Sequence, residues 1–238
     1  MNLLQHHRVQ GYVAQHLVCS VPMQARSVAF TFDDGPNPTV TPRLLQLLER
    51  HGARGTFFLL GRSVERHPNL AREIAARGHE IGNHTHTHAW LPLLPRRLLL
   101  REMERAADAI HLATGRRPDL FRPPMGWFNR SILRTLATHG YRGVLGDVYP
   151  QDAHGPSTAV IVQRVLLRVR PGSIIILHDG VVFGRASREP SLAAVDSLLG
   201  TLRERGFEFC TVSELIARGE AEARAESRES LLAGHAGA

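Results

Sequence analysis

Short apolar runs alternate along the chain with longer stretches in which apolar residues recur every three or four positions. The apolar runs are typical of buried strands, and they begin near residues 27, 55, 80, 119, 143, 173 and 207. The longer stretches predict amphipathic helices, which cover residues 42–52, 70–77, 95–115, 131–140, 158–169 and 191–206. Alternating strands and helices predict parallel strands with the helices outside. Seven such units favour a closed or nearly closed β/α barrel over an open sheet, although periodicity alone does not decide between the two.

The same pattern predicts one domain with a short segment on either side. We expect the barrel to span residues 25–218, after an N-terminal extension, residues 1–24, in which residues 17–21 can add a strand. A short helix is expected over residues 212–218. Residues 219–238 mix charged residues with Ala and Gly and predict a polar tail that is loosely helical or disordered. A length of 238 residues is ordinary for one α/β barrel.

The basic residues of the chain change the picture because all 29 are arginines and none is a lysine, against 22 acidic residues and a net charge of +7. Arginine stays protonated and is not a nucleophile, so a Schiff-base lysine, a P-loop lysine and a carbamylated-lysine metal bridge are excluded. The arginines are spread along the chain, without an aromatic-interleaved basic cluster or a nucleic-acid motif. We therefore expect a solvated arginine-rich surface and no nucleic-acid partner.

Cysteines and apolar runs set further bounds. Cys19 and Cys210 are too few for a disulfide scaffold or a cysteine-based zinc knuckle. No run of about 18 apolar residues exists, so we expect no transmembrane segment. A secretory signal needs a basic start and an uninterrupted apolar segment of about seven residues or more. Polar residues interrupt the first 20 positions, so we expect no export signal in the chain as written, which on that basis points to the cytoplasm: His6, His7, Arg8, Gln10, Gln15 and His16.

Titratable or cationic side chains follow five of the seven predicted strands. They are Asp33 and Asp34, then His84, His86 and His88, then Arg122, then Asp147 and Asp152, and finally His178 and Asp179. In a parallel barrel the carboxyl ends of the strands meet at one mouth, where function collects. We therefore expect these side chains to face a single site.

The histidine tract at residues 84–88 predicts a metal site. His84 and His88 stand four residues apart, which places both imidazoles on one side of a helical turn and suits a single ion. One carboxylate of the Asp33-Asp34 pair completes a two-histidine, one-carboxylate site, and its neighbour is then free to act as a base on a metal-activated water. Alternatives remain: a solvated histidine tract, and an Asp-Asp-Gly-Pro turn or helix cap.

Three further positions suit hydrolysis. Arg122, if buried near Asp33, would keep that carboxylate ionised, although an arginine beside a proline turn is usually at the surface. His178 follows five apolar residues and is a candidate general acid, or else a hydrogen-bonded histidine at a strand end. Two prolines fix the loop before Met125, whose backbone N–H suits an oxyanion.

Taken together, these motifs closely resemble the polysaccharide deacetylase family, the NodB-homology group of carbohydrate esterases. The resemblance is carried in order by residues 31–36 (TFDDGP), 84–88 (HTxxH), 122–126 (RPPMG) and 177–178 (LH), and it spans roughly residues 28–215. It implies a distorted (β/α)7 barrel and a divalent metal, commonly zinc, with Co²⁺, Ni²⁺ or Mn²⁺ as alternatives. It implies removal of N-acetyl groups from an amino-sugar glycan or oligosaccharide, and it adds the cell envelope as a compartment.

The resemblance also implies a set of site residues. The catalytic residues it implies are Asp33, His178, Arg122 and Asp152. The metal ligands are Asp34, His84 and His88. The substrate-binding residues are Pro123, Met125, Trp127 and Leu177.

Individual roles follow from the matched positions. Asp33 resembles the catalytic base, and Arg122 resembles the residue that positions it. His178 resembles the general acid, and Asp152 falls where the family places a carboxylate that tunes this histidine. The Met125 amide matches the oxyanion donor. Of the remaining positions, residue 127 resembles part of the groove wall and residue 177 a lining residue of the acetyl pocket.

One motif departs from the family. Its fourth motif often reads Asp-x-x-Asp-Trp, whereas residues 149–153 read YPQDA, so Ala153 replaces an aromatic wall and puts the identity of the glycan in question. Two alternative functions remain, an O-acetyl ester hydrolase on a glycan and a catalytically idle carbohydrate-binding barrel. An amidohydrolase-type barrel also clusters histidines, but its binuclear form generally needs a lysine bridge, which this chain lacks.

Overall fold

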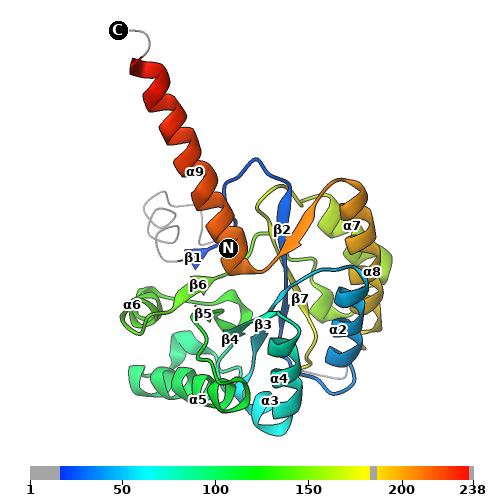
Figure 1. The fold of residues 1–238 in the computed structure, drawn as a ribbon. Coiled ribbons are helices and arrows are strands. Elements are labelled where there is room, and N and C mark those ends of the chain that lie inside the picture. Colours follow the sequence, from blue (N-terminus) through cyan, green and yellow to red (C-terminus); the bar gives the residue numbers. More distant parts are fainter. Residues whose placement is uncertain (1–16, 183–186, 236–238) are drawn as a thin grey trace.

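The computed structural model describes residues 17–182 and 187–235, and within them the chain folds around one parallel sheet (Figure 1). Its strands are β1 (Leu17–Val18), β2 (Ser27–Asp33), β3 (Thr56–Leu59), β4 (Glu80–Asn83), β5 (Leu120–Phe121), β6 (Arg142–Val144), β7 (Ile174–His178) and β8 (Glu208–Cys210). The order across the sheet is β1-β6-β5-β4-β3-β2-β7, and β8 pairs with the first part of β2. All seven predicted strands are present as β2 to β8, and the expected extra strand is β1.

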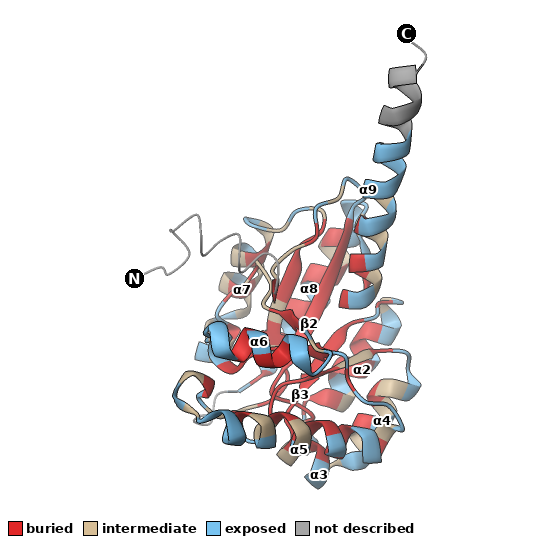
Figure 2. Cartoon of the chain, turned by 90° about the vertical axis from the view of Figure 1, so that its left-hand side faces the viewer, coloured by how far each residue is buried: buried red, intermediate tan, exposed pale blue. Residues whose placement is uncertain are grey.

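The helices lie outside the strands, as predicted. They are α2 (Thr41–Arg50), α3 (Gly61–Arg66), α4 (Pro68–Ala76), α5 (Arg96–Thr114), α6 (Arg130–Thr138), α7 (Thr158–Leu166), α8 (Glu189–Glu204) and α9 (Val212–His235). Three short 3-10 helices, η2 (Leu91–Leu93), η3 (Pro124–Gly126) and η4 (Asp152–His154), lie in loops. Figure 2 shows buried strands inside helices whose outer faces are exposed. The sequence pattern missed α3, which is too short for its periodicity to stand out.

The sheet curls into a barrel that closes loosely. Beyond β6 the chain runs beside β7, where Val148 forms an isolated parallel bridge with Ile175. The Ile176 N–H donates to the Val148 carbonyl at 2.9 Å. A single bridge in place of a full ladder leaves this seam weaker than the others, and the barrel is therefore distorted.

Successive residues of β2 face opposite sides of the barrel wall, as the period of a strand requires. Val28, Phe30 and Phe32 belong to the large core cluster beneath the helices. Ala29 instead packs with Phe58 and residues of five other elements in a separate cluster inside the barrel. The alternation therefore points the next odd-numbered residues of β2, including the aspartate at its end, into the barrel.

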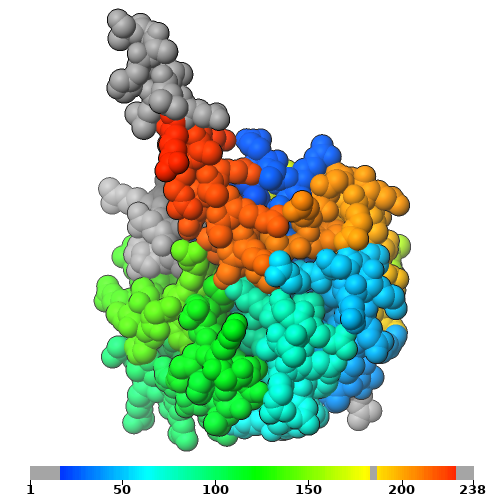
Figure 3. All heavy atoms as spheres, in the orientation of Figure 1, coloured from blue at the N-terminus to red at the C-terminus, as the bar shows by residue number. Residues whose placement is uncertain are grey.

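Helix α9 closes the end of the barrel at which the strands begin. Val212, Leu215 and Ile216 are buried in the interior cluster. The next turn contacts the start of β2 and the segment before it through Arg218 and Glu222, and beyond it the helix projects away from the barrel (Figures 1 and 3). The helix expected over residues 212–218 is thus present and continues to His235. No described helix is both long and apolar enough to cross a membrane.

Candidate active site

The ends of four strands bring the predicted residues together. Asp33 ends β2 and His178 ends β7, and the two are direct partners in the parallel register. Asn83 ends β4 opposite the last residue of β5, so the residues that follow, His84 and Arg122, are also neighbours. Strand register therefore produces the convergence that was expected from the sequence.

Asp34, His84 and His88 form a buried cluster whose geometry suits a metal ion. Asp34 Oδ1 lies 3.6 Å from His84 Nε2 and 3.4 Å from His88 Nε2, and one ligand atom from each residue lies within 4.8 Å of the others. Two ligands of a tetrahedral zinc ion, each about 2.1 Å from the metal, are about 3.4 Å apart. Asp34 Oδ1 is buried and accepts no hydrogen bond from a described residue. Such an orphaned acceptor facing two imidazole nitrogens fits a divalent cation.

The protonation of both histidines also suits metal binding. His84 Nδ1 lies 2.7 Å from the carbonyl of Arg122. A carbonyl only accepts, so Nδ1–H donates and the lone pair of a neutral ring is left on Nε2, which faces Asp34. Burial, and next the charge of His84, lower the pKa of His88 to about 4 although nearby carboxylates oppose the shift. The Nε2 lone pair of His84 and the neutral ring of His88 therefore both suit a metal ligand.

Residues 84–88 are not helical, so the helical-turn explanation of their spacing is wrong. Thr85 and His88 have positive φ angles of 72° and 64°. The Thr85 N–H donates to the Asn83 side chain at 2.8 Å, and the His88 N–H donates to Thr85 Oγ at 3.0 Å. These side-chain bonds hold a turn that brings the two outer histidines together. The middle histidine, His86, instead places Nε2 3.8 Å from a carboxylate oxygen of Glu65, outside the cluster.

Asp33 is paired with Arg122 inside the barrel, as the sequence suggested. Arg122 Nη1 donates to Asp33 Oδ1 and to Thr31 Oγ1, each at 2.7 Å. Burial raises the pKa of Asp33, but the charges of Arg122, His84 and His178 outweigh it and hold this pKa below its usual range. Asp33 is thus an ionised carboxylate at neutral pH.

Asp152 holds His178 by two hydrogen bonds. Its Oδ1 accepts from His178 Nδ1 at 2.8 Å, and its Oδ2 accepts from the His178 backbone N–H at 2.9 Å. Oδ2 also accepts from Ser191 Oγ at 2.9 Å. Burial alone would lower the pKa of His178, but the bond and charge of Asp152, with the charges of Asp33 and Asp34, raise it to about 9. His178 is therefore a protonated imidazolium at neutral pH.

The loop that carries Asp34 packs against Asp179. The backbone N–H groups of Asp179 and Gly180 donate to the Asp33 carbonyl at 3.2 and 3.1 Å. A Cβ on Gly35 would lie 2.4 Å from Asp179 Oδ2, so only glycine lets the loop pack this closely. Asp34 itself has a φ of 74°. Burial raises the pKa of Asp179 to about 7, and this carboxyl supports the loop.

The predicted substrate-binding residues lie in different environments. Pro123 is buried, whereas Met125, with a φ of 58°, and Trp127 are each 50% exposed. Leu177 is fully buried in the core cluster outside the barrel. Ile176 lies on the same face of β7 as His178 and is partly exposed. The two-residue period of a strand is the sequence signal that places Ile176, and not Leu177, on the side of His178.

Two other neighbours of the site were given no role from the sequence. Ser191, on α8, and Thr31, two residues before Asp33 on β2, contact the paired groups described above. Tyr149 places its ring 6.0 Å from that of His178, so an aromatic residue of the divergent fourth motif borders the site. Alternation along β2 predicts the position of Thr31, but no local pattern predicts Ser191, which is 39 residues from its partner.

Asp147 does not belong to the mouth, and that expectation is wrong. Its carboxylate accepts from the Ile174 backbone N–H at 2.9 Å and from Ser173 Oγ at 3.1 Å. Both partners lie where β7 begins, at the opposite end of that strand from His178. The chain turns at Gly146, which has a φ of 98°, and enters the closing seam at the end where β7 begins.

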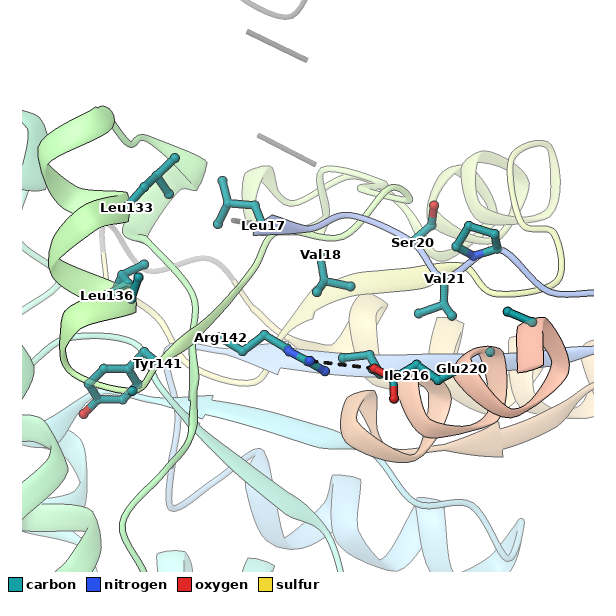
Figure 4. Close-up of a pocket in the computed structure, with 15 residues that line it drawn as sticks. Leu17, Val18, Ser20, Val21, Leu133, Leu136, Tyr141, Arg142, Ile216 and Glu220 are labelled. Atoms are coloured by element: carbon teal, nitrogen blue, oxygen red, sulfur yellow. Dashed lines mark ion pairs between the residues drawn. The ribbon is translucent and has the colours of Figure 1, made fainter. Parts of the chain in front are cut away.

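A separate cleft lies away from this chemistry. A cavity of about 700 Å³ is bordered by β1, α6 and α9, with Leu133 and Leu136 on one wall and Ile216 on another (Figure 4). Arg142 and Glu220 form an ion pair of 3.8 Å across it. None of the predicted site residues lines it, so this cleft is separate from the proposed chemistry.

The fold and the site together define a metal-binding β/α-barrel hydrolase, and comparison with known proteins identifies its family. Residues 20–144 match the sequence profile of the polysaccharide deacetylase family. A peptidoglycan-N-acetylglucosamine deacetylase of Bacillus cereus (strain ATCC 14579) is 36% identical over 208 residues, which are 87% of this chain and 93% of that protein. A chitooligosaccharide deacetylase of Sinorhizobium fredii (strain NBRC 101917 / NGR234) is 40% identical over 193 residues, 77% of this chain and 88% of that protein.

A solved structure agrees with the sequence comparisons. The crystal structure of a peptidoglycan N-acetylglucosamine deacetylase in complex with 4-naphthalen-1-yl-N-oxidanyl-benzamide superposes with a TM-score of 0.84 at 30% identity. The match covers 87% of this chain and 96% of that one. This chain therefore belongs to the polysaccharide deacetylase family, the NodB-homology group of carbohydrate esterases. The family, the distorted (β/α)7 barrel and the enzyme class predicted from the sequence are confirmed.

Proposed function

We propose that this chain is a metal-dependent hydrolase that removes the N-acetyl group from an amino sugar within a glycan or oligosaccharide. The observation that carries the proposal is the placement of three buried metal-ligand candidates next to an ionised carboxylate, Asp33, with a protonated histidine, His178, as the strand neighbour of that carboxylate. Base and acid thus flank one metal site, and amide hydrolysis needs these three functions together.

Asp34, His84 and His88 would hold the metal. Their donor set of one carboxylate oxygen and two imidazole nitrogens suits Zn²⁺ best, and Co²⁺, Ni²⁺ or Mn²⁺ bind the same donors. A bound ion supplies Lewis acidity, which polarises the acetyl carbonyl and makes water more acidic. All other steps fall to groups of the chain itself.

Asp33 acts as the base. Its carboxylate is ionised and is held by Arg122 at 2.7 Å, so it is oriented to take a proton from the attacking water. The Met125 N–H donates to the oxygen of the former carbonyl as negative charge develops there. Met125 has a positive φ of 58° in this loop.

His178 acts as the acid. Asp152 fixes its Nδ1 proton, so Nε2–H is the proton available to the leaving nitrogen. The carbon–nitrogen bond of the acetamide breaks as His178 protonates the nitrogen. The products are a free amine and acetate, which contains one oxygen from water.

The substrate we propose is a polymer or oligomer of N-acetylated glucosamine. Relatives that match most of this chain are named for peptidoglycan N-acetylglucosamine and for chitooligosaccharides. Both substrates contain an acetamido group on a pyranose ring, the group that the proposed machinery cleaves.

Acetate release from N-acetylglucosamine oligomers tests the proposal. We expect release by zinc-loaded protein, loss after removal of the metal with a chelator, and recovery when zinc is returned. An O-acetylated xylan oligomer is the parallel substrate. If acetate is released faster from the ester, then the enzyme is an O-acetyl esterase and not an N-deacetylase. If fully zinc-loaded protein releases acetate from neither substrate, the proposal is contradicted.

A further inference from the structure

Trp90 and Trp127 are the two tryptophans of the chain, and they lie against one another at the protein surface. Their ring centroids are 6.4 Å apart and their planes cross at 76°. Each residue is 50% exposed. Two large flat rings at nearly a right angle form a corner with apolar walls that stay accessible to solvent.

The corner lies on the loops that carry the site. Trp90 follows the metal-ligand candidate His88 by two residues, a span of at most about 7 Å. Trp127 follows Met125, the proposed oxyanion donor, by two residues and caps η3. These loops follow β4 and β5, so both rings extend from the mouth where the proposed chemistry takes place.

The two loops are anchored while the tryptophans stay outside. Leu91 is buried in the same hydrophobic cluster against which Ala89 and Phe128 pack. The immediate neighbours of both tryptophans are therefore held in a shared core. The largest apolar side chains of these loops are left half exposed by a fixed backbone, which would be an unfavourable arrangement without a ligand.

Exposed apolar residues concentrate at this place. Seven large hydrophobic side chains are exposed among the described residues, and four of them lie on these two loops: Trp90, Leu93, Met125 and Trp127. Concentrated exposed apolar surface beside a polar site is typical of a ligand-binding groove. The other three exposed side chains are at separate places on the outer helices or their ends.

A sugar ring matches a corner of this kind. A pyranose has C–H groups on its faces and hydroxyls around its edge, so a face packs on an indole while the edge reaches water or polar groups. Indole rings supply large, rigid apolar area together with one N–H donor. Residues 89–94 and 125–128 contain no basic residue, and Arg96 and Arg130 follow them closely in the sequence, so contact with a lipid surface is one arm of the test below.

We propose that Trp90 and Trp127 form a subsite for a second sugar ring, next to the amino sugar that bears the reacting acetyl group. This inference rests on the proposed function, because it assigns the corner to the same glycan. The subsite makes the enzyme selective for oligomers over the monosaccharide. Trp90 carries the new assignment, since Trp127 was already expected to line the groove.

Intrinsic fluorescence tests the subsite without any turnover, since all tryptophan emission of the chain comes from these two residues. We titrate zinc-loaded Asp33→Asn protein with the N-acetylglucosamine tetramer and with the monosaccharide. The tetramer is expected to produce a saturable change in emission at concentrations at which the monosaccharide has little effect. Trp90→Phe should keep most of the affinity, and Trp90→Ala should weaken it about tenfold.

Kinetics on the otherwise unaltered chain give the second readout. In Trp90→Ala, the ratio of kcat/KM for the tetramer to kcat/KM for the monosaccharide should fall about tenfold. Leu112→Ala is the matched control, because it removes an apolar side chain that is 83% exposed on α5, and it should leave the ratio unchanged.

The outcomes separate this inference from the proposed function. Acetate release with neither an emission change nor a fall in the ratio would overturn the subsite and leave the deacetylase standing. An emission change whose midpoint moves to about tenfold higher tetramer concentration in Trp90→Ala, without acetate release, would support the subsite and contradict the deacetylase. Emission that responds to phosphatidylcholine vesicles and not to the tetramer would overturn the subsite in favour of a membrane contact.

Discussion

Asp152 binds His178 twice, through the ring Nδ1 at 2.8 Å and through the backbone N–H at 2.9 Å. The ring bond and the carboxylate charge outweigh burial and raise the pKa of His178 to about 9. The two hydrogen bonds also fix the orientation of the ring. Asp152 therefore sets both the protonation state and the orientation of the proposed acid.

Replacing Asp152 by Asn should therefore move the basic limb of the pH profile. An acid works while it is protonated, so activity is lost as the pH rises through its pKa. Asp152→Asn removes the charge that raises this pKa, and the basic limb of kcat/KM should shift to lower pH by at least about one unit. Ser191→Ala removes only a neutral partner of the same carboxylate and should shift the limb little. If the basic limb does not move in Asp152→Asn, then His178 is not the acid whose protonation limits the rate.

Removing the charge of Arg122 should affect both stability and the acidic limb. Arg122 is 3% exposed, donates to Asp33, and lies with its guanidinium carbon 4.0 Å from the centroid of the Phe58 ring. Arg122→Met leaves Asp33 as an unpaired buried carboxylate, which should cost about 3–5 kcal/mol of unfolding free energy. The pKa of Asp33 should rise, so the acidic limb of kcat/KM moves to higher pH. Denaturant unfolding and the pH profile measure the two effects, and an unchanged acidic limb would exclude Asp33 as the titrating base.

Zinc should stabilise the fold through the three-residue cluster. A ligand present at a thousand times its Kd adds about 4 kcal/mol, which for a chain of this size raises Tm by about 10 °C. Asp34→Ala should abolish this shift. His86→Gln alters the middle histidine of the same tract, which faces Glu65, and should retain it. Thermal unfolding with zinc and with chelator checks the assignment, and an equal loss in both variants would refute the ligand set.

His79 should make the fold less stable in acid, independently of the active site. Burial, and then the charges of Arg77 and Arg54, lower the pKa of His79 to about 4. The unfolded chain takes up a proton near pH 6.5 and the folded chain near pH 4, so stability present above pH 6.5 is lost as the pH falls between these values. The loss is about 3 kcal/mol. His79→Asn keeps an acceptor for the Gly55 N–H and should flatten this part of the stability profile; a slope equal to that of the parent chain would contradict the assignment.

Local periodicity explains why most of the fold was predictable. β2 is buried at all seven positions and most of its residues are apolar. Helix α5 ends at Thr114, next to the end expected from the sequence, and Gly115 follows it in the left-handed conformation. Helix α3 has six residues, which is too short to show a periodicity. The predicted position of Asp147 was wrong because the course of the chain after β6 depends on a distant partner, the start of β7.

Site residues at the ends of strands could be predicted from the sequence. Site residues that depend on tertiary packing could not. Asp33, Arg122 and His178 each come at the end of a strand or directly after one, so register alone brings them together. The turn of residues 84–88 rests on left-handed residues, which composition does not reveal. Ser191 approaches Asp152 only because α8 packs against this side of the barrel.

In the function that we propose, Asp33 acts as the base beside the metal held by Asp34, His84 and His88. The most direct test measures zinc content and acetate release in the same samples of the parent chain and of Asp33→Asn. We predict equal zinc content and a fall in acetate release from the N-acetylglucosamine tetramer of about 10²–10⁴-fold. Unchanged acetate release by fully zinc-loaded Asp33→Asn would contradict the claim.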